Sequence, residues 1–265
     1  MAVVYFQRVN TPAPYLSIII PAYNEEQRIV RTLDATLDFL GAQSYASEII
    51  VVDDGSRDRT AEVVSEFEQR AAGRLRLLRN PGNRGKGYAV RNGMLHSRGA
   101  IALFFDADLA TPLSEVEKVI GPIVNNQYDV VFGSRALNRG LIQERQSWLR
   151  ELRGRAGNLL MRGLVGLNFM DTQCGFKAFR REVVQPVFSR QQIEGFGFDP
   201  EILFIAQKQG WRLLEVPVRW SHVEGSKVTL FGSTVKVLAE VMKIRWNDLS
   251  GKYNGKAELM QARHS

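Results

Sequence analysis

Two acidic residues separated by a single position, Asp106 and Asp108, directly follow a wholly apolar segment at residues 100–105. Two carboxylates so close together repel each other unless protons or a cation intervene. Hard oxygen ligands suit Mg²⁺ or Mn²⁺, and Mg²⁺ commonly combines one or two carboxylates with the phosphates of its substrate. The pair is therefore a candidate metal site, although acidic residues in loops also serve as helix caps.

Polar or glycine-rich clusters also follow other apolar segments of the chain. They are PAYNEE at 21–26, DDGS at 53–56, NPGNRGKG at 80–87 and GSR at 133–135. Because ligands of open parallel sheets bind at the carboxyl ends of the strands, these clusters predict one shared crevice. DDGS is equally typical of a turn followed by a helix cap, and its functional interpretation is hydrogen bonding to a nucleotide base or ribose. The spacings of a P-loop and of a dinucleotide-binding glycine motif are both missing from the sequence.

The elements that must position these clusters alternate between short apolar runs and helical patterns. This alternation is typical of βαβ units, in which helices cover a parallel sheet. We expect strands at 16–20, 48–52, 74–78, 100–105 and 129–132, and helices at 25–40, 58–72, 85–97 and 113–126.

The pattern changes after residue 135. We expect a basic amphipathic helix at 143–168, a short strand in CGFKAFRR, a helix at 199–209, a strand at 211–220 and an amphipathic helix at 230–249. Pro217 places the strand at 211–220 at a sheet edge or a bulge. The polar tail from Gly251 is expected to fray. Packed positions are predicted for Cys174, Trp148, Trp211 and Trp246.

Composition and charge narrow the class of protein. The chain has 265 residues, of which 45% are hydrophobic and 24% charged, so disorder and a disulfide-stapled mini-protein are excluded. We expect a cytoplasmic protein for three reasons. The sequence has a single cysteine, it has no run of 18 apolar residues, and it shows no secretory signal. Residues 135–181 hold ten Lys and Arg residues against three acidic ones, within a net charge of +7. Such an excess indicates an anionic partner: a phosphate, a nucleic acid or an acidic membrane surface.

The segments PAYNEE, VVDDGSRD, NRGKGYAVRNG, DADLATP, GSR and DTQCGFKAFRR, in this order, resemble glycosyltransferase family 2. The resemblance spans about residues 16–228 and is closest to the polyprenyl-phosphate sugar synthases, the dolichyl-phosphate glucosyltransferases first and the mannose synthases second. Ala110 stands where mannose synthases usually carry Gln after their DXD-Leu, which favours the glucosyl branch.

The resemblance implies an α/β nucleotide-diphospho-sugar transferase (GT-A) fold. In this fold a mostly parallel, Rossmann-like central sheet is flanked by helices, and here C-terminal amphipathic helices would follow. Residues 1–265 would form a single domain. Residues 15–135 would bind the nucleotide sugar, and residues 136–250 would provide the acceptor and membrane-interface half.

Site residues are implied by the same resemblance. Asp106 and Asp108 would hold Mg²⁺ or Mn²⁺ on the diphosphate. Arg135 would face the sugar or the acceptor phosphate, and the segment from Asp171 to Lys177 would form the acceptor side. The implied catalytic residues are Asp108, Arg135, Asp171 and Lys177.

The implied nucleotide-sugar contacts lie in both halves of the chain, and Ser226 and Lys227 would close over the diphosphate. His222 is a further candidate metal ligand. The full set of nucleotide-sugar contacts is Pro21, Tyr23, Glu25, Asp53, Lys86, Asp106, Ser226 and Lys227.

The implied activity is the metal-dependent transfer of a hexose, with inversion, to a polyprenyl or dolichyl phosphate. The implied hexose is glucose, and the implied donor is UDP-glucose. Eukaryotic glucosyl enzymes carry an N-terminal membrane anchor that this sequence does not show, so we expect peripheral attachment to the cytoplasmic face of the membrane. The basic amphipathic segments 143–168 and 230–249 would lie at that surface, unless they pack on the core.

Other activities stay open at this point. One is a mannose-synthase-like enzyme that uses GDP-mannose. Another is a soluble family 2 enzyme with a hydroxyl acceptor, which needs a catalytic carboxylate, for which Asp171 and Asp199 are candidates. A non-enzymatic nucleotide-sugar or nucleic-acid binder is disfavoured, because both acids of the pair are intact and few aromatic residues interleave with the basic ones.

Overall fold

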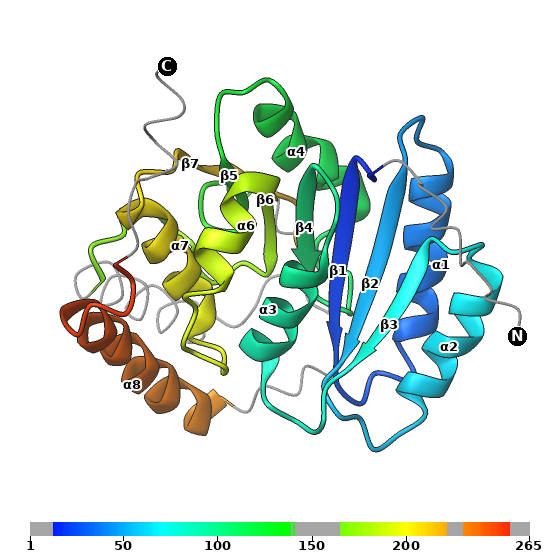
Figure 1. Ribbon diagram of the computed structural model, residues 1–265, viewed down its shortest axis with the longest axis horizontal. Coiled ribbons are helices and arrows are strands. Elements are labelled where there is room, and N and C mark those ends of the chain that lie inside the picture. The colour runs from blue at the N-terminus through cyan, green and yellow to red at the C-terminus, as the bar shows by residue number, and fades with distance from the viewer. Residues whose placement is uncertain (1–12, 139, 141–164, 222–229, 255–265) are drawn as a thin grey trace, which may run out of the picture.

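A computed structural model describes residues 13–138, 140, 165–221 and 230–254 of the protein (Figure 1). Its centre is a seven-stranded sheet in the order β3-β2-β1-β4-β6-β5-β7. The strands are β1 (Leu16–Ala22), β2 (Ser47–Asp53), β3 (Leu75–Arg79), β4 (Ile101–Phe105), β5 (Val130–Ser134), β6 (Phe176–Arg180) and β7 (Leu213–Pro217).

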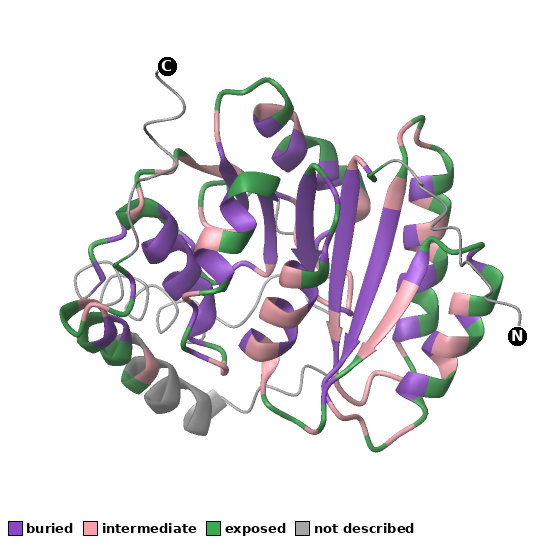
Figure 2. Cartoon of the chain, in the orientation of Figure 1, coloured by how far each residue is buried: buried purple, intermediate pink, exposed green. Residues whose placement is uncertain are grey.

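The central strands are apolar runs because both faces of the sheet are covered. Every residue of β4 and β5 is buried, and Figure 2 shows the middle of the sheet as buried along its length. One face packs against α3 (Lys86–His96), α6 (Arg181–Phe188) and α7 (Phe198–Lys208). The other face packs against α1 (Ile29–Gly41), α2 (Thr60–Arg70) and α4 (Val116–Val124).

The direction of β6 decides which residues reach the carboxyl edge of the sheet. β6 runs antiparallel to both of its neighbours, β4 and β5, whereas the other pairs of neighbouring strands are parallel. Phe105, the last residue of β4, is paired with Phe176, the first residue of β6. The residues just before β6 therefore lie beside those just after β4.

Most of the predicted elements are confirmed. Each expected strand overlaps one of β1 to β7, and Pro217 closes β7, which is an edge strand as predicted. The helix expected at 113–126 starts as a short 3₁₀ helix, η1 (Leu113–Glu115), and continues as α4. The helix expected at 143–168 falls almost entirely on residues 141–164, which lie outside the described part of the chain.

Two predictions about the C-terminal part are wrong. Trp246 on α8 (Leu230–Leu249) is 69% exposed rather than packed in the core. The start of the tail is anchored, because Tyr253 is buried and its hydroxyl donates to Glu201 at 2.6 Å, whereas residues 255–265 lie outside the described part of the chain. No helix in the described ranges is long and apolar enough to cross a lipid bilayer.

Candidate functional site

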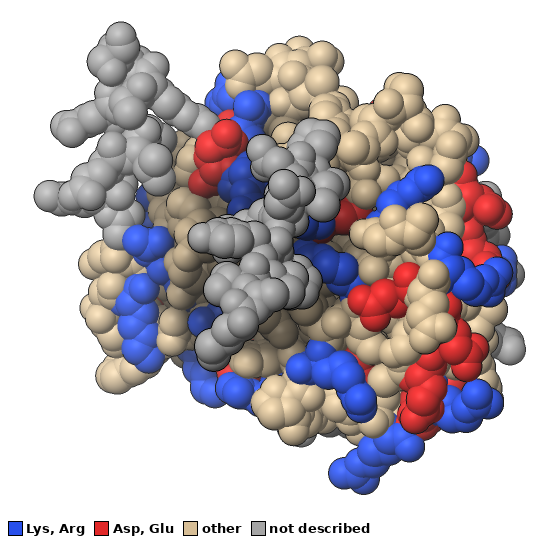
Figure 3. Space-filling view, turned by 45° about the vertical axis from the view of Figure 1, so that its right-hand side comes forward, with Lys and Arg blue, Asp and Glu red and all other residues tan. Residues whose placement is uncertain are grey.

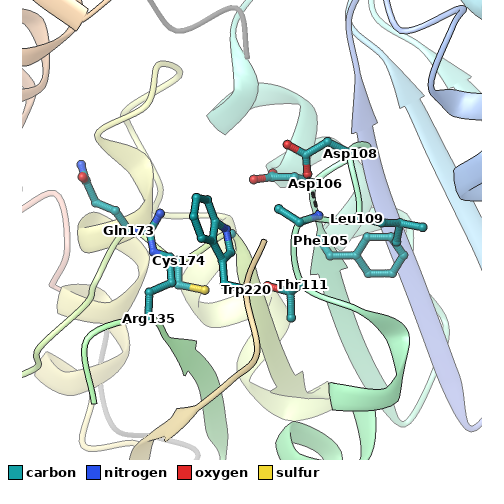
Figure 4. A pocket seen from close by; sticks show the side chains of 11 residues that line it. Phe105, Asp106, Asp108, Leu109, Thr111, Arg135, Gln173, Cys174 and Trp220 are labelled. Carbon is teal, nitrogen blue, oxygen red and sulfur yellow. Dashed lines mark hydrogen bonds between the residues drawn. The ribbon is translucent and has the colours of Figure 1, made fainter. Parts of the chain in front are cut away.

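A pocket lies at the carboxyl edge of the sheet, where β4, β5 and β7 end and β6 begins (Figure 4). It encloses about 350 Å³, including space that is open to solvent. Acidic side chains come from the end of β4, and a guanidinium, an amide and an indole come from the neighbouring strand ends. The lining residues are Phe105, Asp106, Asp108, Leu109, Ala110, Thr111, Arg135, Gln173, Cys174, Gly175 and Trp220.

Asp106 and Asp108 project side by side into this pocket (Figure 4). The backbone N–H of Ala110 donates to Asp108 Oδ1 at 3.0 Å. Leu109, between Asp108 and Ala110, takes a positive φ of 52°. Burial, together with the charge of Asp106, raises the pKa of Asp108 above its ordinary value. A cation bound between the two carboxylates would relieve this repulsion.

Lys86, the first residue of α3, provides a positive charge at the pair. Its Nζ lies 2.6 Å from Asp106 Oδ1, and its side chain is 18% exposed. Burial opposes the charge of Lys86, but Asp106 and Asp199 outweigh it and raise the lysine pKa. Lys86 is thus brought into direct contact with one of the two predicted metal ligands.

Gly175 fits against the back of Asp106 because of the pairing between β4 and β6. A Cβ at position 175 would lie 2.5 Å from Asp106 Oδ2 and 2.8 Å from its Cγ. Only a residue without a side chain leaves the Asp106 carboxylate where it is.

Arg135 lies across the pocket from the acids and is held by Asp171. Its Nε and Nη2 donate to the two Asp171 oxygens at 2.6 and 2.8 Å, and its backbone N–H donates at 3.0 Å. The carboxylate of Glu215 on β7 accepts from the backbone N–H groups of Met170 and Asp171 at 2.8 and 2.7 Å. The Arg135 side chain is 36% exposed, and these hydrogen bonds hold its guanidinium in one orientation.

The Arg135–Asp171 pair stays charged. Burial opposes the charge of Arg135, but Asp171 outweighs it and raises the arginine pKa. Burial likewise works to raise the pKa of Asp171, but Arg135 lowers it below its ordinary value. The pair therefore presents a permanent guanidinium to the pocket.

Lys177 lies beneath the pocket and not in its wall. It is fully buried, its Nζ is 2.5 Å from Asp199 Oδ1, and it also donates to the backbone carbonyl of Cys174 at 2.5 Å. Asp199 is buried too. In this position Lys177 holds the backbone at Cys174 and is not among the lining residues of the pocket, so its predicted catalytic role stays a prediction.

Cys174 lines the pocket but is packed, as predicted. It is 2% exposed, and burial raises the pKa of its thiol to about 12. A thiol with so high a pKa is a poor nucleophile at neutral pH.

The clusters after β1, β2 and β3 form a second, adjoining part of the edge. The side chain of Asp54 accepts from the N–H of Gly85 at 2.7 Å and from the Asn80 amide at 2.7 Å, which holds the 80–85 loop. Gly55, at a φ of 72°, approaches Gly82 so closely that a Cβ would lie 2.6 Å from its backbone. The DDGS segment therefore acts as a turn, as one of its two interpretations predicts.

Asp53 has spare hydrogen-bonding capacity within this turn. It is fully buried, and its Oδ1 accepts from the N–H of Ser56 at 3.0 Å. Its Oδ2 accepts no hydrogen bond from the described residues, and the nearest cation is Arg79 Nε at 3.6 Å. A buried carboxylate oxygen in this state calls for a donor from outside the described residues, such as a water molecule or a ligand hydroxyl.

Pro21 lies within β1, near its end, and Tyr23 and Glu25 follow this strand next to the DDGS turn. Glu25 is engaged by Arg28, with Nε 2.7 Å from Glu25 Oε2. These three residues do not line the pocket described above.

The acid pair fits a divalent cation that is completed by the substrate. Asp106 and Asp108 supply hard oxygen atoms, and the described residues hold no group of three or more His, Cys, Asp or Glu side chains that could bind a metal alone. Mg²⁺ and Mn²⁺ tolerate this ligand set when phosphate oxygens and water complete it. His222, Ser226 and Lys227 lie outside the described residues.

Gln173 and Trp220 are pocket residues that the sequence interpretation misses. Gln173 lies within the predicted acceptor segment but has no assigned role. Trp220 is hidden by the interpretation of 211–220 as one strand, whereas β7 ends at Pro217. If the predicted strand had stopped at Pro217, the rule that ligands bind just after strand ends would have indicated Trp220.

Comparison with known proteins identifies the family. The family model "Glycosyl transferase family 2" matches residues 17–188. Dolichyl-phosphate beta-glucosyltransferase of Dictyostelium discoideum is 39% identical over 248 residues, which cover 89% of this chain and 76% of that protein. The Homo sapiens protein of the same name is 36% identical over 256 residues, 92% of this chain and 79% of the relative.

Solved structures confirm the predicted GT-A fold. Glucosyl-3-phosphoglycerate synthase of Mycobacterium tuberculosis superimposes with a TM-score of 0.62 at 20% identity, covering 87% of this chain and 80% of that one. A second structure of that enzyme, in complex with Mn²⁺, UDP and glucosyl-3-phosphoglycerate, has a TM-score of 0.59 at 19% identity with the same coverage. The predicted class of activity, hexosyl transfer, is confirmed by the family and its relatives. The two relatives align with about nine-tenths of this chain, and the family model matches most of it. This protein therefore belongs to glycosyltransferase family 2.

Proposed function

We propose that this protein transfers glucose from UDP-glucose to a dolichyl or related polyprenyl phosphate, with inversion at the anomeric carbon. The observation that carries the proposal is the pocket itself, in which two carboxylates face a guanidinium fixed by an ion pair. The names of the relatives support glucose and dolichyl phosphate, and the complex of the Mycobacterium tuberculosis enzyme supports UDP and a divalent cation.

Asp106 and Asp108 would hold Mg²⁺ or Mn²⁺ against the donor diphosphate. When bound, the cation supplies Lewis-acid stabilisation of the charge that develops on the departing UDP. Lys86, which contacts Asp106, provides a second positive charge on the same side. The negative charge on the leaving UDP would thus be neutralised by the cation held at the end of β4 and by Lys86 of α3.

Arg135 would orient the acceptor phosphate. The lipid phosphate attacks the anomeric carbon through an oxygen, and its second pKa of about 6 leaves it largely ionised at pH 7. A strong general base is therefore unnecessary. A fixed guanidinium offsets the repulsion between two anionic substrates, and its planar donors match a phosphate.

The state of the buried carboxylates supports a phosphate acceptor over a hydroxyl acceptor. Asp171 and Asp199 are the acids that could serve as base for a hydroxyl. Asp171 is bound by Arg135 through two side-chain hydrogen bonds, and Asp199 is buried against Lys177. Neither is placed to accept a proton from a substrate without losing its ion pair.

Attachment to a membrane surface is part of the proposal, because the acceptor is a lipid. α8 carries an exposed apolar stripe at helical spacing, formed by Met242, Trp246 and Leu249, which are 56%, 69% and 84% exposed. Lys243 and Arg245 on the same helix are exposed beside it. Tryptophan and apolar residues flanked by basic ones are typical of helices that lie in a membrane interface.

The test measures UDP release from purified protein mixed with UDP-glucose, Mn²⁺ and a short-chain polyprenyl phosphate. We expect UDP release that requires both the cation and the lipid phosphate, and little release with the corresponding polyprenol. Asp108→Asn should abolish turnover, because it removes one of the two negative ligands. Asp34→Asn, on the exposed side of α1, is the matched control and should retain full activity.

Parallel reactions with GDP-mannose separate the donors. Faster turnover of GDP-mannose would replace glucose by mannose in the proposal. Transfer to the polyprenol at a rate equal to transfer to the phosphate would overturn the assignment of the acceptor.

A further inference from the structure

The order of strands along the carboxyl edge divides the site into two sides. β3, β2 and β1 lie on one side of β4, and β6, β5 and β7 lie on the other. The turn with the spare Asp53 oxygen belongs to the first side, the acid pair to β4, and Arg135 and Trp220 to the second. A nucleotide sugar joins its nucleoside to its hexose through the diphosphate, so with the diphosphate at β4 and the nucleoside over β1–β3, the side of β6, β5 and β7 is the one left for the hexose.

Trp220 is the aromatic side chain that projects into the pocket on this second side (Figure 4). Its indole lies between the acid pair and the side chains of Arg135 and Cys174 in that view. The guanidinium carbon of Arg135 lies 5.8 Å from the ring centroid. Arg135 thus lies beside the indole, and both side chains line the pocket together with the acid pair.

The backbone around Trp220 is fixed from both sides. Val218 N–H donates to the Ser134 carbonyl at 3.2 Å, and Ser221 N–H donates to the Ala110 carbonyl at 2.9 Å. Arg219 Nε donates to the buried carboxylate of Glu115 at 2.6 Å. A large, partly exposed aromatic ring held this firmly at a pocket wall is a preorganised binding surface.

From these contacts we infer that Trp220 and Gln173 form the wall that recognises the donor hexose. The flat indole would pack on the apolar C–H face of the sugar ring. The exposed Gln173 amide, which has both donors and an acceptor, would bind sugar hydroxyls. The inference rests on the proposed function, because it takes the ligand to be a nucleotide sugar.

Binding of UDP and of UDP-glucose, each with Mn²⁺, tests this inference by calorimetric titration. Loss of the flat ring in Trp220→Leu should weaken UDP-glucose binding about tenfold and leave UDP binding unchanged. Trp220→Phe should lose much less, because it keeps an aromatic face. The matched control is Trp211→Leu just before the other end of β7, which should change neither affinity once thermal melting shows that it is folded.

Gln173→Ala gives a second comparison that does not depend on the stability of the core, since Gln173 is exposed. It too should weaken UDP-glucose and spare UDP. An equal loss of both ligands, or no loss of either, would overturn the inference. A raised KM for the lipid phosphate with unchanged UDP-glucose affinity would overturn it by placing the wall on the acceptor. Failure of the unaltered protein to bind either nucleotide would instead refute the proposed function.

Discussion

The contact between Gly175 and Asp106 makes one position in the backbone decisive for the acid pair. Gly175→Ala would place a Cβ 2.5 Å from Asp106 Oδ2, so the carboxylate must move. A displacement of about 1 Å at a reacting centre can cost about a hundredfold in rate. We expect turnover to fall by about that factor and Mn²⁺ affinity to fall with it, measured by UDP release and by electron paramagnetic resonance of free Mn²⁺.

The control for this substitution is Gly121→Ala in α4, where an added Cβ meets nothing within 4 Å. It should leave turnover unchanged, and because Pro122 follows it no gain in helix stability is expected. Normal turnover in Gly175→Ala would show that Asp106 does not need its present position.

Lys86 neutralises Asp106 through a 2.6 Å ion pair. Removing the ammonium in Lys86→Met takes away the cation in direct contact with the acid pair, so Mn²⁺ binding in the absence of nucleotide should become several-fold tighter. Donor binding should weaken, because the diphosphate loses a positive partner. Lys208→Met removes the lysine of another Lys–Asp pair, on α7, and should change neither property. Weaker Mn²⁺ binding in Lys86→Met would mean that the lysine shapes the site rather than competing for it.

Charged site residues can be predicted from the sequence when they directly follow an apolar strand. Asp106 and Arg135 do so, and the structure brings them into one pocket. Trp220 follows its strand by three residues across a proline, so the alternating pattern hides it. The burial of Lys177 was not predictable either, because its buried partner Asp199 lies 22 positions further along the chain.

At the scale of elements, a buried acid joins α7 to the turn that follows α8. Glu201 of α7 accepts from the Tyr253 hydroxyl at 2.6 Å and from the N–H groups of Gln192 and Ile193 at 2.9 Å each. Burial raises the pKa of Glu201 to about 7 from an ordinary value of 4.5. The folded state therefore binds more protons than the unfolded state between these two values.

The sign of the resulting pH dependence follows from linkage. Because the folded pKa is raised, the stabilising contribution of Glu201 is full below pH 4.5 and is lost as the pH rises through 7. The free energy of unfolding, relative to Glu201→Gln, should fall by about 2 kcal/mol between pH 5 and pH 8. Urea unfolding of both proteins at the two pH values measures this difference. A constant difference would contradict the raised pKa.

The strands were predictable because both faces of the sheet are buried, which leaves continuous apolar runs such as that of β4. The direction of each strand was not predictable, because an apolar run looks the same in a parallel and in an antiparallel strand. β6 is the antiparallel one. α6 was missed although Val183, Val184, Val187 and Phe188 form a buried face, because Pro186 lies inside it and no loop separates it from β6. Local patterns thus specify elements but not the connections between them.

At the scale of the whole molecule, charge is unevenly distributed. Figure 3 shows basic side chains on both halves of one face, with most of its acidic side chains on the right-hand half. The net charge of +7 favours an anionic surface, and each basic residue near such a membrane contributes about 1 kcal/mol. This attraction is screened by salt, since the Debye length is about 8 Å at physiological ionic strength.

α8 is the described element best suited to meet that surface. Its inner side is fixed by the buried Ile244 and by Glu240, which accepts from the Gly197 N–H at 2.7 Å, so the stripe of Met242, Trp246 and Leu249 faces outward. We expect the protein to sediment with vesicles that contain anionic lipid at low salt, and to be released by high salt.

Replacing all three stripe residues by serine should abolish sedimentation with the vesicles while leaving UDP-glucose binding intact, because the stripe lies apart from the pocket residues. Val124→Ser, at an apolar position on α4 that is 50% exposed, is the control and should sediment normally. Equal sedimentation with neutral vesicles and at high salt would refute the electrostatic part of the attachment. Unchanged sedimentation of the serine variant would remove α8 from the membrane interface, because the remaining basic surface would then be sufficient for binding.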